Sequence, residues 1–472
     1  MINGRLQEIS EQLNGQLHGN DAGFTGVSID SRKLSTGELF IAIQGDRFDG
    51  HEFVPNAAEC GAAGALVHHL QQASLPQVQV GDTRLALSQL AAAWRREFDI
   101  PVIAVTGSNG KTTVKNMLAA IMSQCGPVLS TCGNLNNDIG LPLTLLRLSA
   151  EHRCAVIEMG ANHPGEIAGL TKITRPTVGV ITNAGKAHLE GFGSPEGVAR
   201  AKGELLAGLP ADGSVVINAD QPCAALWKQL AGEREIISFG LVRDARFTAS
   251  DVSQGVRNGQ PWLRFSITAP SGNFPVELNF AGAHNVMNAL AAAAAASAAG
   301  ADNDAIRDGL QATRQVSGRL QLLSRKGGGW LIDDTYNANP VSTRVAMEFA
   351  ASLEGRHWLV LGDMGELGSG AELMHQELGL AAGELGFERI YSCGDLAARA
   401  ASAFPGESRR FNRLDELIEA LHEDLPAAEK NGSDDSSEQV IPLLKASRSM
   451  GFDKIVDALC VAATENGECQ GE

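Results

Sequence analysis

The segment IPVIAVTGSNGKTTVKNML, residues 100–118, predicts a strand, a glycine-containing turn and a helix that opens on a lysine and two threonines. Gly107 and Gly110 permit backbone angles that other residues resist, so successive N–H groups can point at one anion. The N-terminus of the following helix also favours negative charge. The segment therefore predicts a polyphosphate-binding loop in which Lys111 reaches the terminal phosphates and Thr112 can ligate Mg²⁺.

This loop is shorter than the common phosphate loop, which has a further glycine where this chain has Val105. The missing glycine leaves the cradle of N–H groups intact. A strand–helix turn with chance glycines is the plain alternative, but the run T-G-x-x-G-K-T-T between a strand and a helix argues against it. The predicted helix keeps one apolar face, made by Val114, Met117, Leu118, Ile121 and Met122.

The bulk composition predicts a folded, multidomain chain that does not bind nucleic acid. Its 472 residues suggest about three domains. Apolar residues make up 44% and charged residues 20%, which is enough for packed cores. The formal net charge of −17 would repel a nucleic acid, and the aromatic content of 5% argues against base stacking.

Several features indicate a cytoplasmic protein. None of the eight cysteines forms a CxxC pair, so we expect reduced thiols. The first residues, MINGRLQEISEQLNG, lack the apolar core of a signal peptide. The alanine-rich segment at 289–301 is short and predicts a tightly packed buried helix, so we expect no membrane span.

The order of apolar segments predicts an α/β protein of three domains. Residues 1–82 read as a small α/β unit, and the apolar spacing at 82–98 predicts a helix that leads to the next unit. Residues 83–313 alternate strands and helices, which predicts a doubly wound, mostly parallel sheet. Residues 314–472 form a third, Rossmann-like series. The polar segment at 427–440 is interpreted as a mobile loop.

Three further side chains are candidate metal ligands because they follow predicted strands of the central sheet, where ligands gather in doubly wound folds. These are Glu158, His188 and Lys202. A buried glutamate needs a metal or a cationic partner, so Glu158 is either a ligand or part of a structural ion pair. His188 could simply pack or cap, and Lys202 alone would be interpreted as a surface lysine.

An ordered set of motifs resembles the Mur ligases across all three proposed domains. The motifs are AVTGSNGKTT (104–113), STCGNLNNDIGLPLTLL (130–146), AVIEMGANHPGEI (155–167), ITNAGKAHLEGFGS (181–194), AKGELL (201–206), GAHNVMNALAA (282–292), SGR (317–319) and DDTYNANPVS (333–342).

The resemblance implies a site for ATP and two Mg²⁺ ions. Thr112 and Glu158 would hold one ion, while His188 and a carbamylated Lys202 would help to hold the second. The ATP phosphates would be bound by Gly107, Ser108, Asn109, Gly110, Lys111, Thr112 and Thr113. The resemblance places Asn285 at the adenine and His284 and Arg319 near the phosphates. From the third domain, Asp334 and Tyr336 would contact the nucleotide.

The resemblance also implies the sites of the other substrates. Asn134, Asn136 and Asn137 would help to place the acceptor. In the first domain, SIDSR (28–32) and IQGDRFDGH (43–51) would hold a UDP sugar, with candidates Ser31, Arg32, Asp49 and His51. The segment LLKASRSMGFDKIV (443–456) resembles the family's last motif and places Lys445 and Arg448 near the incoming dipeptide.

Within the family, the sequence resembles the member that adds D-alanyl-D-alanine to UDP-N-acetylmuramoyl-tripeptide through an acyl phosphate. TYNANP (335–340) and VLGDMGELG (360–368) fit that member, and the Asp-Asn-Pro-Arg motif of ligases that add the third residue is absent. A monomer is expected. The alternatives are a sister amide ligase, such as another Mur ligase or a folylpolyglutamate synthase, a plain phosphate-loop kinase, and a nucleotide-binding protein that has lost catalysis.

Overall fold

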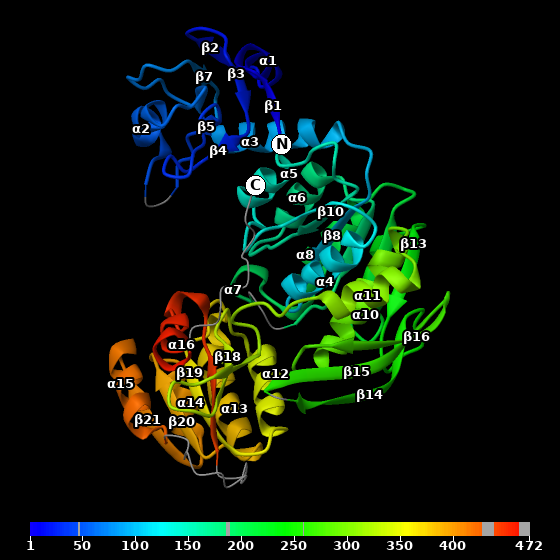
Figure 1. The fold of residues 1–472 in the computed structure, drawn as a ribbon, viewed down its shortest axis with the longest axis vertical. Coiled ribbons are helices and arrows are strands. Elements are labelled where there is room, and N and C mark those ends of the chain that lie inside the picture. Colours follow the sequence, from blue (N-terminus) through cyan, green and yellow to red (C-terminus); the bar gives the residue numbers. More distant parts are fainter. Residues whose placement is uncertain (46–47, 186–188, 258, 427–438, 462–472) are drawn as a thin grey trace.

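The chain forms three α/β units that follow one another in sequence, which confirms the predicted fold class (Figure 1). The blue N-terminal part and the yellow-to-red C-terminal part lie at opposite ends of the molecule, with the cyan and green part between them. The computed structural model describes residues 1–45, 48–185, 189–257, 259–426 and 439–461. The predicted loop at 427–440 lies outside these residues except for its last two positions.

The N-terminal unit is built on a mixed sheet, called the N-terminal sheet, in the order β2-β7-β6-β5-β4. Its strands are β2 (Gln16–His18), β4 (Val27–Ser28), β5 (Leu39–Ile41), β6 (Gly64–Val67) and β7 (Gln77–Gln79). A separate antiparallel pair and three helical segments complete the unit: β1 (Asn3–Arg5), β3 (Gly23–Thr25), α1 (Leu6–Gln12), η1 (Gly50–Phe53) and α2 (Val54–Glu59).

The predicted helix at 82–98 is confirmed as α3 (Thr83–Arg96). It begins at Asp82, whose carboxylate accepts the backbone N–H groups of Arg84 and Leu85 at 2.8 and 3.0 Å. Such a cap satisfies N–H groups that the first turn of a helix leaves unpaired. The buried residues of α3 join one hydrophobic core with both the N-terminal sheet and the next unit, so the helix connects the two.

The central unit contains a fully parallel sheet, called the central sheet, in the order β13-β12-β11-β8-β10-β9. Its strands are β8 (Val102–Thr106), β9 (Val128–Ser130), β10 (Cys154–Glu158), β11 (Val178–Ile181), β12 (Ser214–Asn218) and β13 (Glu235–Phe239). The helices of this unit are α4 (Lys111–Ser123), α5 (Gly140–Leu145), α6 (Glu166–Thr174), α7 (Leu189–Phe192), α8 (Pro195–Ala207), α9 (Ala224–Ala231), α10 (His284–Ala298) and α11 (Asn303–Ala312). Because β8 lies between β10 and β11, the loops after these three strands meet at one edge, where doubly wound folds bind ligands.

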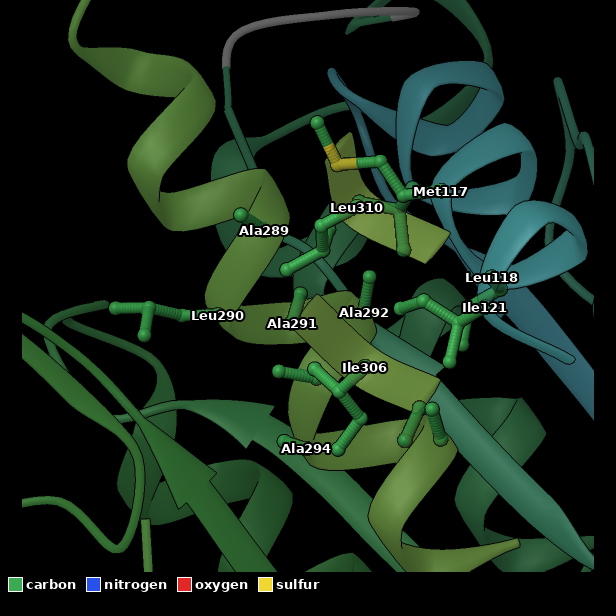
Figure 2. Close-up of a cluster of buried hydrophobic side chains, with 14 of the residues drawn as sticks. Met117, Leu118, Ile121, Ala289, Leu290, Ala291, Ala292, Ala294, Ile306 and Leu310 are labelled. Atoms are coloured by element: carbon green, nitrogen blue, oxygen red, sulfur yellow. The ribbon is translucent and has the colours of Figure 1, made fainter. Parts of the chain in front are cut away.

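The alanine-rich segment forms the buried helix α10, as predicted, and Ala289 to Ala296 are all fully buried. Figure 2 shows its alanines packed beside Met117, Leu118 and Ile121 of α4 and Ile306 and Leu310 of α11. A Cβ added to Gly309 of α11 would lie 2.3 Å from the Cα of Ile121. Small residues therefore let these three helices pack closely behind the phosphate loop.

One element of the central unit was not predicted, an antiparallel sheet of β14 (Thr248–Arg257), β15 (Gln260–Ala269) and β16 (Gly272–Leu278). In β15 buried residues alternate with more exposed ones, the pattern of a sheet with one covered face. The same alternation of apolar and polar residues is visible in the sequence and could have predicted this strand. The buried face of the sheet belongs to the same core as α10.

The C-terminal unit contains a sheet, called the C-terminal sheet, in the order β17-β18-β22-β19-β20-β21, parallel except for β17. Its strands are β17 (Gln321–Ser324), β18 (Trp330–Asp334), β19 (Arg356–Gly362), β20 (Arg389–Cys393), β21 (Glu407–Phe411) and β22 (Val440–Lys445). The helical segments are α12 (Pro340–Ala351), η2 (Gly368–Gly370), α13 (Ala371–Glu384), α14 (Ala397–Ala403), α15 (Leu414–Asp424), η4 (Arg448–Met450) and α16 (Asp453–Leu459).

Two chain-wide expectations can be compared with the described residues. Six cysteines in that part of the chain carry free thiols, namely Cys60, Cys125, Cys154, Cys223, Cys393 and Cys460. Within the same ranges, no helix combines the length and the apolar character needed to cross a bilayer.

Candidate active site

One large cleft, of about 2230 Å³, brings together most of the predicted site residues from the central and C-terminal units. The predicted residues that line it are Ser108, Asn109, Gly110, Lys111, Thr112, Thr113, Asn134, Asn136, Asn137, Glu158, His284, Asn285, Arg319, Asp334, Tyr336, Lys445 and Arg448. Gly107 and Lys202 are not part of this lining. His188 lies outside the described residues.

The phosphate loop needs glycine at two positions. Gly107 has φ of 149°, and a Cβ there would lie 2.0 Å from the Oγ1 of Thr182. Gly110 has φ of 80°, and a Cβ there would lie 2.4 Å from the Oδ1 of Asn288. Both positions combine a left-handed backbone with a close neighbour, so only glycine fits without displacement.

The loop is held open by residues that follow β11. The backbone N–H of Ser108 donates to the carbonyl of Asn183 at 3.0 Å, and that of Asn109 donates to the Asn183 Oδ1 at 2.9 Å. The carbonyl of Asn109 accepts from the Thr182 hydroxyl at 2.6 Å and from the Asn183 amide at 3.0 Å. The strand next to β8 thus fixes the shape of the loop before any ligand binds.

The Lys111 ammonium folds over the loop. Its Nζ donates to the carbonyls of Gly107 at 2.7 Å and Ser108 at 3.3 Å. Burial lowers the pKa of Lys111, the negative Glu158 raises it, and the positive Arg319 lowers it. The N–H groups of Ser108 and Asn109 are taken by Asn183, so the predicted cradle is limited to the N–H groups at the start of α4. A lysine in this position adds a positive charge beside that helix N-terminus, which suits a polyphosphate.

Glu158 ends β10 as predicted and has the properties of a cation ligand. Its side chain is only 2% exposed. One carboxylate oxygen, Oε1, accepts from the amide of Asn136 at 2.8 Å, whereas Oε2 is buried with no hydrogen-bond partner among the described residues. An unpaired buried carboxylate oxygen is costly unless a cation is bound, so this side chain fits a Mg²⁺ ligand.

Lys202 lies on α8 with only 1% of its surface exposed, which contradicts the plain reading of a surface lysine. Its Nζ lies 3.5 Å from the carbonyl of Ala161 and 5.3 Å from the centre of the Phe192 ring. Burial, with a smaller contribution from the charge of Lys111, lowers the pKa of Lys202 to about 7. Much of this amine is therefore neutral near pH 7, and a neutral amine is a nucleophile.

The C-terminal unit contacts the phosphate loop directly. Arg319 Nη2 donates to the Thr112 hydroxyl at 3.1 Å, and Asn339 Nδ2 donates to Asn109 Oδ1 at 2.7 Å. The Arg319 guanidinium lies over the Tyr336 ring at 4.2 Å, which orients it. Arg448 lies on the same ring at 5.6 Å. Positive groups from the third unit therefore face the loop across the cleft.

Asp334 and Lys445 form a buried ion pair. The Lys445 Nζ lies 2.6 Å from Asp334 Oδ2 and also donates to the carbonyl of Asn337 at 2.6 Å. The other Asp334 oxygen accepts the backbone N–H of Leu320 at 3.1 Å. Lys445 thus connects the end of β18, the Tyr336–Asn337 turn and the segment that carries Arg319.

The start of α10 lines the cleft opposite these groups. Asn285 Nδ2 donates to the carbonyl of Ala281, and Asn288 Nδ2 donates to Asn285 Oδ1, each at 2.8 Å. Asn288, which sequence reasoning missed, also lies against Gly110. Its signal was an asparagine pair spaced by three residues in an otherwise apolar helix, which places both side chains on one face.

The predicted asparagines after β9 have different contacts. Asn136 holds Glu158, as described above, and Asn134 is exposed to the cleft. Asn137 Oδ1 accepts the backbone N–H of Gly140 at 2.9 Å at the start of α5. Two of the three therefore have structural contacts in addition to their place in the cleft.

The four candidates of the N-terminal unit do not line the large cleft. Ser31 is buried, and Arg32 pairs with Asp30 of its own turn at 2.9 and 2.8 Å. Asp49 Oδ1 accepts the backbone N–H of His51 at 2.9 Å and contacts its Nδ1 at 2.6 Å. These contacts are local, so the structure does not join these residues to the phosphate loop.

The sequence matches three models of one family, in the order in which the units occur. They are the Mur ligase family catalytic domain at residues 23–95, the Mur ligase middle domain at 105–296, and the Mur ligase glutamate ligase domain at 318–432. The chain is also 43% identical to the UDP-N-acetylmuramoyl-tripeptide--D-alanyl-D-alanine ligase of Escherichia coli strain K12, over 99% of this chain and 100% of that protein.

The chain belongs to the Mur ligase family. Solved structures of the family agree with its fold. The crystal structure of MurF from Acinetobacter baumannii has a TM-score of 0.88 and 35% identity, covering 96% of this chain and 97% of that chain. The MurF ligase of Thermotoga maritima, solved in complex with ADP, has a TM-score of 0.78 and 27% identity, covering 92% and 96%.

Proposed function

We propose that this Mur ligase adds D-alanyl-D-alanine to UDP-N-acetylmuramoyl-tripeptide with ATP, giving the pentapeptide precursor of peptidoglycan for cell wall biogenesis. The observation that carries the proposal is the full-length identity of 43% with the Escherichia coli ligase of that name. The cleft supports the reaction type, because a phosphate loop, a buried carboxylate with an unpaired oxygen and two arginines face one space.

The first step activates a poor electrophile. The tripeptide carboxylate attacks the γ-phosphorus of ATP, the bond to the β-phosphate oxygen breaks, and an acyl phosphate and ADP form. Two anions must approach one another for this, so positive groups must offset their repulsion. Lys111 on the loop and Arg319 from the opposite wall supply charge on either side of the phosphate chain.

The second step forms the amide bond. The free amine of D-alanyl-D-alanine attacks the acyl carbon, and a tetrahedral intermediate forms. The bond between the acyl carbon and the phosphate oxygen then breaks, inorganic phosphate leaves with the electron pair of that bond, and the amine nitrogen loses a proton. Water would hydrolyse the acyl phosphate, so the cleft must exclude it. The contacts of Arg319 and Asn339 with the loop support closure of the C-terminal unit over the nucleotide.

The donors present fit Mg²⁺, which ATP-dependent ligation uses to neutralise phosphate charge. Thr112 and Glu158 would hold one ion. His188 and a carbamylated Lys202 would help to hold a second. Burial of Lys202 supports the modification, because its neutral amine can add to CO₂ and, after loss of a proton, become a carboxylate-like carbamate.

Carbon-13 NMR of protein equilibrated with ¹³CO₂ tests the carbamate. A carbamate resonance present in the wild type and missing from Lys202→Ala is expected. The N-terminal amine of Met1, whose pKa burial also lowers, is the competing site. A resonance that survives in Lys202→Ala would assign the modification elsewhere.

The proposal also assigns a substrate to each unit and gives the location and the oligomeric state of the protein. Residues 1–82 would bind the UDP sugar, residues 83–313 ATP, and residues 314–472 the dipeptide, with Arg448 near it. The ammonium of Lys445, the other residue expected there, is instead bonded to Asp334 and Asn337. The protein acts in the cytoplasm as a monomer.

Phosphate release from ATP and Mg²⁺ in the presence of UDP-N-acetylmuramoyl-tripeptide tests the function. Release that requires D-alanyl-D-alanine, with a product heavier by the dipeptide less one water, is expected. Release that requires glutamate or another single amino acid would instead identify a sister ligase. Release of phosphate with no amine would indicate hydrolysis, whereas formation of ADP without release of phosphate would indicate kinase chemistry. Formation of neither ADP nor phosphate with any amine would indicate a protein that has lost catalysis.

A further inference from the structure

Three histidines lie together in the N-terminal unit, outside the large cleft. His51 belongs to η1, and His68 and His69 directly follow β6. The ring centroids of His51 and His68 are 4.0 Å apart, those of His51 and His69 are 4.3 Å apart, and those of His68 and His69 are 4.5 Å apart. One ring nitrogen from each can be chosen so that all three lie within 4.8 Å of one another.

His51 is fixed in orientation by a carboxylate. Its ring is only 1% exposed, and its Nδ1 lies 2.6 Å from Asp49 Oδ1. Its Nε2 accepts the backbone N–H of His68 at 3.0 Å, so the proton is on Nδ1 and the lone pair is on Nε2. A carboxylate on one ring nitrogen is the usual support of a metal-binding histidine, and the other nitrogen of His51 is held by the His68 N–H, which an ion has to displace.

The electrostatics of the cluster favour neutral rings or a bound cation. Burial lowers the pKa of His51, the charges of His68 and His69 lower it further, and Asp49 offsets this only in part. Three imidazoles at these distances repel one another when protonated. The chain as a whole carries a formal net charge of −17, which attracts cations.

We propose that His51, His68 and His69 bind a divalent transition-metal ion of the zinc class. Imidazole nitrogen suits Zn²⁺, Co²⁺ and Ni²⁺, whereas Mg²⁺ prefers the oxygen ligands of the cleft. Binding replaces the His68 N–H by the ion at His51 Nε2. It also turns the exposed His69 ring, which stacks on His51 with an angle of 15° between the ring planes, so that its lone pair points to the ion.

The three histidines do not line the cleft, so the ion site is separate from the proposed ATP site, while His51 also belongs to the unit proposed to bind the UDP sugar. The competing explanation is packing of neutral imidazoles with no ion. Packing alone predicts no change in any metal-dependent signal when His68 and His69 are replaced, which makes the two explanations separable.

The test uses the full chain in excess Mg²⁺, so that oxygen sites are filled, and adds Co²⁺ and then Zn²⁺. The wild type should show visible absorption of tetrahedral Co²⁺ and bind about one equivalent of Zn²⁺. His69→Asn should weaken Zn²⁺ binding about tenfold, and His68→Asn with His69→Asn at least about a hundredfold, with loss of the Co²⁺ bands. His422→Asn, an exposed histidine on α15, is the matched control and should behave as wild type.

Two results would overturn the proposal. One is a wild type without tetrahedral Co²⁺ bands. The other is a double variant that keeps the wild-type Zn²⁺ affinity, with circular dichroism showing that it is folded. His69 is exposed, so the single variant supplies a measurement even if the double variant does not fold.

Discussion

Replacing Lys445 by methionine should weaken ATP binding and leave binding of the dipeptide almost unchanged. Met keeps the length and apolar stem of the side chain but removes the ammonium that bonds Asp334 and Asn337. The Lys445 side chain is 3% exposed and that of Asp334 is 14% exposed. The substitution thus leaves a largely buried carboxylate without its cation.

The size of the effect follows from that burial. Removing one partner of a buried ion pair costs about 3–5 kcal/mol, and the lower end of about 3 kcal/mol applies because Asp334 keeps the Leu320 N–H and some contact with water. The protein can relieve that cost by moving Asp334 and Arg319 out of the arrangement that binds ATP. A cost of about 3 kcal/mol lowers the population of the ATP-binding arrangement up to about a hundredfold. We therefore expect the Kd for ATP to rise about 10- to 100-fold.

Calorimetric titration with a non-hydrolysable ATP analogue measures this Kd directly, and steady-state kinetics give the KM for D-alanyl-D-alanine. The dipeptide KM should stay within about twofold of wild type. Lys454→Met, at an exposed lysine of the same unit, is the control and should change neither value. A dipeptide KM that rises while the ATP affinity is unchanged would refute this reasoning and make Lys445 a direct dipeptide contact, as the sequence predicts.

Other substitutions and labelling test the remaining site geometry. Gly110→Ala should raise the KM for ATP about tenfold or more. The control is Gly165→Ala, because Gly165 also has a positive φ, of 88°, but no atom lies within 4 Å of the added Cβ. This control should lower the free energy of unfolding by about 1 kcal/mol and leave the KM for ATP unchanged. Equal effects on KM would contradict the close contact at Gly110. Glu158→Gln should lower kcat/KM about a hundredfold or more and shift the Mg²⁺ dependence to higher concentration, and an unchanged Mg²⁺ titration would exclude it as a ligand. Burial raises the pKa of Cys154 to about 12, so below that pH its thiol stays protonated and iodoacetamide at about pH 8 should label exposed Cys60 but not Cys154, as peptide mass spectrometry would show.

The sequence by itself determined the features that depend on neighbours in the chain. The strand, turn and helix at 100–118 are local, and the positive φ of Gly107 and Gly110 follows from the turn itself. The amphipathic α3 could be predicted because a repeat of 3.6 residues identifies a buried helical face, and α10 could be predicted because a short alanine-rich segment is typical of a tightly packed buried helix. The ordered motifs then indicated the family, which the comparisons confirm.

Only the tertiary structure decided which distant side chains meet. β18 and β22 are far apart in sequence, and their register places Asp334 beside Lys445, which gives that lysine an ion-pair partner that no local pattern specifies. Likewise, the burial of Lys202 and the meeting of His51 with His68 depend on packing between separate elements. Local backbone preferences act over a few residues, whereas burial, charge pairing and pKa depend on groups brought together by folding, and therefore the chemistry of these side chains is set by the fold.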